Sequence, residues 1–303
     1  MVDLTADLGW TKLKNPVITA SGAFGYGEEF LPFLDLDILG ALVLKGIYLH
    51  PREGNPPPRL CETPSGLLNS IGLPGIGADK LKETIRRLTE RTRTPIIVNI
   101  CGEEDREFLE VARVFDEMAE VSALELNISC PNVREGGKCP AQDRRHTYRL
   151  VRRIKRNIRK PLLVKLTPNV ADLSSIALSA EDAGADALSL VNTFLGLAVD
   201  LESRRSVFTN FFAGLSGPAI KPLALKLVWD VLRHVRIPVI GIGGVVSGKD
   251  VLDYLLVGAS AVQIGTVNFS EPAAAVRIIS ELEEEMEKLH INNLTEIRGK
   301  LQT

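Results

Sequence analysis

The sequence is poor in aromatic residues and carries no marked excess of charge of either sign. Aromatic residues make up only 5% of the 303 residues, and 36 Lys and Arg are balanced by 38 Asp and Glu, for a formal net charge of −2. Binding to nucleic acid or to a membrane surface relies on concentrated basic charge. The composition therefore argues against both kinds of partner.

Cysteine and histidine are scarce and do not form a metal-binding pattern. The four cysteines, at positions 61, 101, 130 and 139, contain no Cys-x-x-Cys pair, and the four histidines do not lie at metal-ligand spacings. We therefore expect no metal site and no disulfide framework. The N-terminal residues do not resemble a signal peptide, and no apolar run approaches the roughly 18–20 residues of a membrane span. We expect a cytoplasmic protein with reduced thiols.

Glycine and proline are well supplied, and eight short apolar runs recur between them. Their β-branched residues lack two-residue alternation, which is typical of parallel strands buried on both faces. The runs are Pro16–Ala20, Ala41–Leu44, Pro95–Val98, Ala123–Leu126, Pro161–Val164, Ala185–Leu190, Ile237–Ile240 and Ser260–Ile264. Helix-period stretches separate them at Asp79–Arg93, Glu103–Glu120, Asp143–Arg159, Ala171–Ala183, Pro218–Val235 and Ser247–Val257, and a last one follows at Ser270–His290. This order predicts an α/β protein, a single-domain (β/α)8 TIM barrel over residues 1–303.

Two connections are longer than the others. Gly46–Gly77 follows the second predicted strand, and Asn192–Gly217 follows the sixth. Long loops inside a compact domain are usually functional, and loops that follow barrel strands lie at the active-site face. We therefore expect both connections to border the active site.

Polar residues and glycines follow the predicted strands. Because the carboxyl ends of barrel strands share one face, these groups should converge on a polar ligand there. They are Ser21, Lys45, Gly46, Asn99, Asn127, Lys165, Asn192, Thr193, Gly243, Gly244, Gly265 and Thr266.

The glycines after the seventh and eighth strands favour a phosphate site over ordinary tight turns, the alternative interpretation. Gly243-Gly244 and Gly265-Thr266 allow the backbone N–H groups to approach an anion closely. Val246 stands where a dinucleotide fingerprint requires its last glycine, so the sequence gives no support for nicotinamide binding by this chain.

Lys165, with Asn99 and Asn127, suits a flat ring that is rich in heteroatoms. A lysine near N1 and O2 of a flavin stabilises the reduced anion. Two alternatives stay open for Lys165: an ion pair with a barrel carboxylate, and a Schiff-base nucleophile in a lyase that acts on a sugar phosphate.

Cys130 lies in the polar segment Asn127–Val133, which follows the fourth strand. A thiol has an ordinary pKa of about 8.5 and can remove a proton once nearby cations lower that value. The alternative is a small buried apolar side chain, but the flanking Asn, Ser and Pro residues argue against core packing.

Four segments resemble the class 1 dihydroorotate dehydrogenases, and the resemblance extends over essentially the whole chain. They are NPVITASGAFGYG at 15–27, LNSIGL at 68–73, NISCPNV at 127–133 and GLSGPAIKP at 214–222. The first and the last favour class 1B, the NAD-linked form, over the fumarate-linked class 1A. One stretch departs from the family: Lys138–Ala141 stands where class 1B has an aromatic-glycine pair.

The resemblance implies an FMN enzyme that oxidises dihydroorotate to orotate in de novo pyrimidine biosynthesis. Cys130 would remove the proton from C5 while hydride leaves C6 for FMN. The FMN-binding residues would be Ser21, Lys45, Gly46, Asn99, Asn127, Lys165, Val191, Gly217, Gly243, Gly244, Gly265 and Thr266. The substrate-binding residues would be Lys45, Asn69, Ser70, Ile71, Gly72, Leu73, Asn127, Asn192 and Thr193.

The resemblance also implies a partner protein. Class 1B catalytic subunits pass electrons to a second subunit that carries FAD and a [2Fe–2S] cluster and reduces NAD, in a heterotetramer with two copies of each subunit. The cysteines of this chain lack a cluster spacing, so it is not that second subunit. A class 1A enzyme and a flavoenzyme similar to dihydropyrimidine dehydrogenase remain the alternatives.

Overall fold

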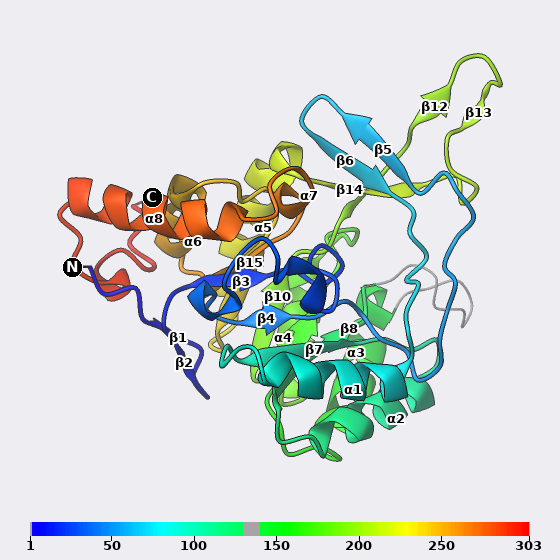
Figure 1. Ribbon diagram of the computed structural model, residues 1–303, viewed down its shortest axis with the longest axis horizontal. Helices are drawn as coiled ribbons and strands as arrows, with labels where there is room; N and C mark the ends of the chain where they lie inside the picture. The colour runs from blue at the N-terminus through cyan, green and yellow to red at the C-terminus, as the bar shows by residue number, and fades with distance from the viewer. Residues whose placement is uncertain (1, 130–139, 303) are drawn as a thin grey trace.

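The computed structural model describes residues 2–129 and 140–302, and Figure 1 shows the arrangement of its elements. The predicted strands are present as β3 (Val17–Thr19), β4 (Leu42–Val43), β7 (Ile96–Ile100), β8 (Val121–Asn127), β9 (Leu162–Lys165), β10 (Ala187–Leu190), β15 (Val239–Ile242) and β16 (Ala261–Ile264). They form one parallel sheet in the order β3-β16-β15-β10-β9-β8-β7-β4. A short hairpin, β1 (Ala6–Asp7) and β2 (Lys12–Leu13), precedes this sheet.

The two end strands of this sheet meet, so the sheet closes into a barrel. Ile18 of β3 forms a parallel bridge with Ala41, directly before β4. The Thr19 hydroxyl donates to the Val43 carbonyl at 3.2 Å and accepts from the Val43 N–H at 2.9 Å. A side chain thus replaces part of the backbone ladder at the seam. The predicted TIM barrel is confirmed.

Helices cover the outside of the barrel. They are α1 (Ala78–Thr89), α2 (Asp105–Asp116), α3 (Arg144–Lys155), α4 (Leu173–Asp182), α5 (Lys221–Leu232), α6 (Gly248–Val257), α7 (Val267–Ser270) and α8 (Ala274–Lys288). The remaining short turns are the 3-10 helices η1 (Glu28–Phe30), η2 (Leu36–Ile38), η3 (Pro140–Gln142), η4 (Pro218–Ile220) and η5 (Leu294–Glu296). None of the helices in the described ranges has both the length and the apolar character that a membrane span requires.

The connection after β3 contains only η1 and η2, whereas a strict alternation of strands and helices would place an α-helix there. Gly22, Gly25 and Gly27 all have positive φ in this connection. That backbone conformation is incompatible with a continuous right-handed helix, which explains the missing helix.

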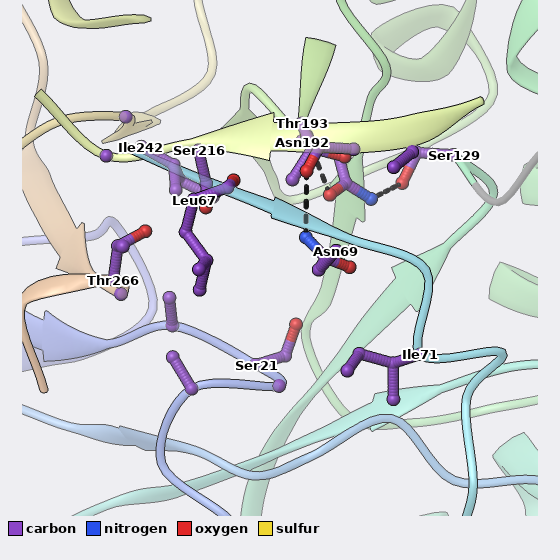
Figure 2. Close-up of a pocket in the computed structure, with 18 of the residues that line it drawn as sticks. Ser21, Leu67, Asn69, Ile71, Ser129, Asn192, Thr193, Ser216, Ile242 and Thr266 are labelled. Atoms are coloured by element: carbon purple, nitrogen blue, oxygen red, sulfur yellow. Dashed lines mark hydrogen bonds between the residues drawn. The ribbon is translucent and has the colours of Figure 1, made fainter. Parts of the chain in front are cut away.

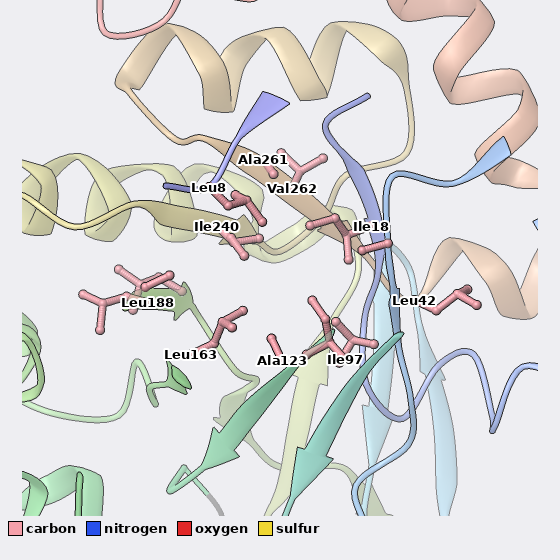
Figure 3. Packing of buried hydrophobic residues seen from close by; sticks show 14 of the residues in the cluster. Leu8, Ile18, Leu42, Ile97, Ala123, Leu163, Leu188, Ile240, Ala261 and Val262 are labelled. Atoms are coloured by element: carbon pink, nitrogen blue, oxygen red, sulfur yellow. The ribbon is translucent and has the colours of Figure 1, made fainter. Parts of the chain in front are cut away.

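The core lies inside the barrel and between its strands and helices. Four of its side chains, one each from β3, β7, β9 and β15, are at most 2% exposed and belong to one cluster (Figure 3): Ile18, Ile97, Leu163 and Ile240. Because the strands are buried on both faces, their sequences read as continuous apolar runs. Because these strands are so deeply buried, polar side chains on them indicate a role other than core packing.

The two long connections contain strands that we did not predict. They are β5 (Leu60–Thr63), β6 (Gly66–Asn69), β11 (Phe194–Gly196), β12 (Val199–Asp200), β13 (Arg205–Ser206) and β14 (Ala213–Ser216). Four of them form an antiparallel sheet in the order β11-β14-β6-β5, which we call the roof sheet, while β12 and β13 form a separate hairpin (Figure 1). Strand β6 pairs with β14, so the roof sheet ties the two connections together.

Candidate active site

A cavity of about 540 Å³ lies where the barrel strands end and the roof sheet begins. Figure 2 shows side chains from both parts: Ser21 and Thr266 follow barrel strands, whereas Leu67, Asn69 and Ser216 belong to the roof sheet. This volume is within the range of small-molecule and cofactor sites. The location is the one that active sites occupy in TIM barrels.

The structure brings the predicted site residues together in this one cavity. Every predicted FMN-binding and substrate-binding residue contributes to its wall. Cys130, the predicted base, lies outside the described residues; its neighbour Ser129 lines the cavity. The structure therefore supports the grouping of these residues, while their individual roles remain predictions.

Two lysines give the cavity its positive charge. Lys45 is partly buried; burial lowers the pKa of its ammonium group, an effect that the nearby Glu29 opposes. Lys165 is 4% exposed and donates to the Ser21 hydroxyl at 3.0 Å. Its Nζ lies 3.8 Å from Oε1 of Glu125. Lys165 thus makes the ion pair that was one alternative interpretation and lines the cavity at the same time.

A chain of hydrogen bonds fixes the amides of the cavity wall. Asn127 donates to Oδ1 of Asn99 at 3.2 Å and accepts from the Ser129 hydroxyl at 2.7 Å. Ser129 also accepts from Asn192. From the roof sheet, Asn69 donates to the Gly214 carbonyl at 3.0 Å (Figure 2). With their amides held in this way, these side chains present fixed donors and acceptors to a ligand.

The glycines after β15 and β16 contribute backbone to the cavity wall. Gly243 and Gly244 have φ values of 134° and 67°, which favour glycine. In the described part of the chain, the backbone N–H groups of Gly244, Val245, Gly265 and Thr266, which line the cavity, make no hydrogen bond. Behind this surface, the buried Tyr254 hydroxyl donates to the Gly243 carbonyl at 2.7 Å. Converging free N–H groups are suited to phosphate.

Sequence reasoning missed several polar residues in or behind the cavity wall, among them Asn55, Asn169 and Glu125. Asn55 holds the 70–71 segment, with its Nδ2 3.1 Å from the Ser70 carbonyl. Asn169 donates to the Thr193 carbonyl at 3.0 Å, and it follows β9 in the same way that the predicted residues follow their strands. Glu125 precedes Asn127 by two residues on β8, and this spacing places both side chains on the inner face of the barrel.

Comparison with known proteins identifies the family. The family model described as "Dihydroorotate dehydrogenase" matches residues 4–286. A protein from Geobacter sp. (strain M21) is 47% identical over 300 residues, which is 99% of this chain and 98% of that protein. One from Bacteroides thetaiotaomicron is 43% identical over 302 residues and all of both chains. Both are named dihydroorotate dehydrogenase B (NAD(+)), catalytic subunit.

A solved structure shows the same fold. The crystal structure of DHODH from Eimeria tenella in complex with ferulenol superimposes with a TM-score of 0.83 at 24% identity, over 98% of this chain and 88% of the other. The relatives confirm the resemblance to the NAD-linked class that the sequence motifs indicated. The chain belongs to the dihydroorotate dehydrogenase family.

Proposed function

We propose that this chain is the catalytic subunit of an NAD-linked dihydroorotate dehydrogenase that oxidises dihydroorotate to orotate in pyrimidine biosynthesis with FMN. The observation that carries the proposal is the convergence of all described FMN-binding and substrate-binding candidates on one cavity. In our proposal, the chain is one FMN-binding domain. Its two long connections, residues 46–77 and 192–217, lie at the active-site face.

The cavity fits FMN. The partnerless N–H groups of Gly244, Val245, Gly265 and Thr266 suit its phosphate, and the buried cation of Lys165 suits a ring system that gains negative charge. Asn99 and Asn127 offer amide groups in the wall of the same cavity. When bound, FMN supplies the acceptor for the hydride that leaves C6 of dihydroorotate.

The substrate is held by charge and by amide hydrogen bonds. Lys45 provides a cation for the dihydroorotate carboxylate, while the amides of Asn69, Asn127 and Asn192 suit the alternating N–H and C=O groups of its ring. Backbone groups of the 70–73 segment and Thr193 complete this set. Cys130 removes the proton from C5 as the base, and the fixed amides hold C5 in place.

Electrons then leave the chain through a partner subunit that carries FAD and a [2Fe–2S] cluster and reduces NAD. This part of the proposal is supported by the names of the relatives, which are catalytic subunits of the NAD(+) type. We propose a cytoplasmic heterotetramer with two copies of each subunit.

The proposed function is tested by anaerobic addition of dihydroorotate to the purified chain reconstituted with FMN. We expect dihydroorotate to bleach the flavin absorbance, dihydrouracil not to do so, fumarate not to restore the colour, and NAD reduction to require the co-expressed partner. Bleaching by dihydrouracil alone would contradict the substrate, and recovery with fumarate would contradict the NAD-linked class. A chain that binds no FMN but is trapped by borohydride with a sugar phosphate would instead be the Schiff-base lyase.

Substrate affinity should fall at alkaline pH because of Lys45. Burial lowers the pKa of Lys45 from its ordinary value of about 10.4. The ammonium charge is lost as the pH rises through this lowered pKa, so orotate binding should begin to weaken at a pH below about 10.4. The dissociation constant for orotate, measured from the flavin spectrum, reports this change. The measurement involves no turnover, so it does not include the titration of the catalytic base.

The matched control for this pH dependence is Lys45→Arg, whose guanidinium stays charged throughout. We expect its orotate affinity to remain constant over the same range. If the orotate affinity of the parent protein stays constant up to pH 10.5, Lys45 does not provide the cation that binds the substrate carboxylate.

A further inference from the structure

Glu125 is a fully buried carboxylate beneath the floor of the cavity. It is 0% exposed and lies on β8, and it does not line the cavity, whereas its neighbours Lys165 and Asn99 do. The reaction proposed above leaves it without a role. It can act on a bound molecule only through the residues that it holds.

Among the described residues, the polar contacts of the Glu125 carboxylate are all with donor groups, and these come from four other barrel strands. Its Oε2 accepts from the Gln263 amide at 2.6 Å and from the Ser189 hydroxyl at 2.7 Å. Its Oε1 accepts from the Asn99 amide at 2.7 Å and lies 3.8 Å from Nζ of Lys165. This set of contacts suits a carboxylate that accepts at both oxygens.

This arrangement is not explained by packing of the barrel. Inner layers of TIM barrels come from alternate strands and are dominated by branched apolar residues. Here the alternate strands β8, β10 and β16 contribute Glu125, Ser189 and Gln263 to one polar layer. In the described chain, the buried Oε1 of Gln263 has no hydrogen-bond partner. Because a buried ion pair is at best weakly stabilising compared with apolar residues, the layer points to a role at the site above it.

We propose that Glu125 is a positioning residue that orients Asn99 and Lys165 and, through its charge, lowers the reduction potential of the bound FMN. This inference rests on the proposed function. Lys165 stabilises the negative charge of reduced FMN, and a carboxylate 3.8 Å from its Nζ opposes that effect inside the barrel. Charges interact strongly where water is excluded, so the pair sets the potential together.

Glu125→Gln tests the proposal because it removes the charge and keeps the shape. The new amide group can donate to the partnerless Oε1 of Gln263 after that side chain rotates, so we expect the fold and the FMN content to be kept. The affinity for reduced FMN relative to oxidised FMN should rise at least tenfold. This is an increase of about 30 mV for a two-electron couple, measurable by anaerobic redox titration against a reference dye.

The matched control is Glu284→Gln on the exposed face of α8, for which we expect the parent potential. If Glu125→Gln binds FMN with an unchanged or lowered reduction potential, this inference is overturned and the proposed function is not. A parent chain that binds no FMN would instead overturn the proposed function.

A second comparison applies if Glu125→Gln does not fold. Lys165→Met leaves the carboxylate without its cation, and Lys165→Met/Glu125→Gln removes both charges. Titration of the two apoproteins with oxidised and reduced FMN gives the affinity ratio even where binding is weak. We expect the affinity ratio to favour reduced FMN at least tenfold more in the double variant than in Lys165→Met. Equal ratios in the two variants would overturn the proposal.

Discussion

Replacement of Cys130 by alanine should leave FMN bound and slow the oxidation of dihydroorotate by about 10²–10⁴-fold, the usual contribution of a general base. The proton on C5 then has no positioned acceptor, while the cavity that holds FMN keeps all its described residues. Flavin reduction by dihydroorotate in an anaerobic stopped-flow experiment measures this step directly. Orotate binding, followed in the same variant, separates lost chemistry from lost affinity.

Cys61→Ala is the matched control, because Cys61 is a partly exposed thiol on β5 and is not predicted to react. We expect its flavin reduction to proceed at the parent rate. If Cys130→Ala also reduced its flavin at the parent rate, Cys130 would not be the base.

Lys165→Ala should have two effects: loss of FMN and destabilisation of the barrel. The variant loses the cation that we propose for the flavin site, and it leaves the carboxylate of Glu125 buried without its opposite charge. Removal of one partner of a buried ion pair costs about 3–5 kcal/mol. We therefore expect purified Lys165→Ala to carry little FMN, and its apoprotein to unfold at lower denaturant concentration than the parent apoprotein.

Two further variants separate these effects. Lys165→Ala/Glu125→Gln should recover part of the stability without recovering FMN. Lys226→Ala removes the lysine of an exposed pair with Asp230 on α5, which is worth about 0–1 kcal/mol, and should behave like the parent. Parent-level flavin content in Lys165→Ala would contradict the role that we assign to this lysine.

The barrel and most of the cavity wall could be predicted because both follow from local rules. Strands buried on two faces read as apolar runs, and the residue after each strand must lie at one end of the barrel. Lys45, Asn99 and Gly243 were found in this way. Val191, Gly217 and the 69–73 segment came from the resemblance, because they carry no distinctive chemical pattern of their own.

Long-range pairing could not be predicted in the same way. Strand β6 pairs with β14, about 150 positions later in the chain. Neither connection contains a sequence pattern that indicates pairing with the other. The network around Glu125 was missed for a similar reason. Its three hydrogen-bond donors and the Lys165 ammonium come from four different strands, and only the closed barrel brings them together around the carboxylate.

The roof sheet also determines where the chain can change in length during evolution. Surface connections usually accept insertions, but β6 pairs with both β5 and β14 in fixed register, with Asn69 opposite Gly214. One additional residue in β6 would turn each following side chain to the opposite face of the sheet. Asn69 would then leave the cavity, and the buried Leu68 would replace it. Length variation among relatives should therefore concentrate in the β12–β13 hairpin, where an insertion leaves the cavity wall in place.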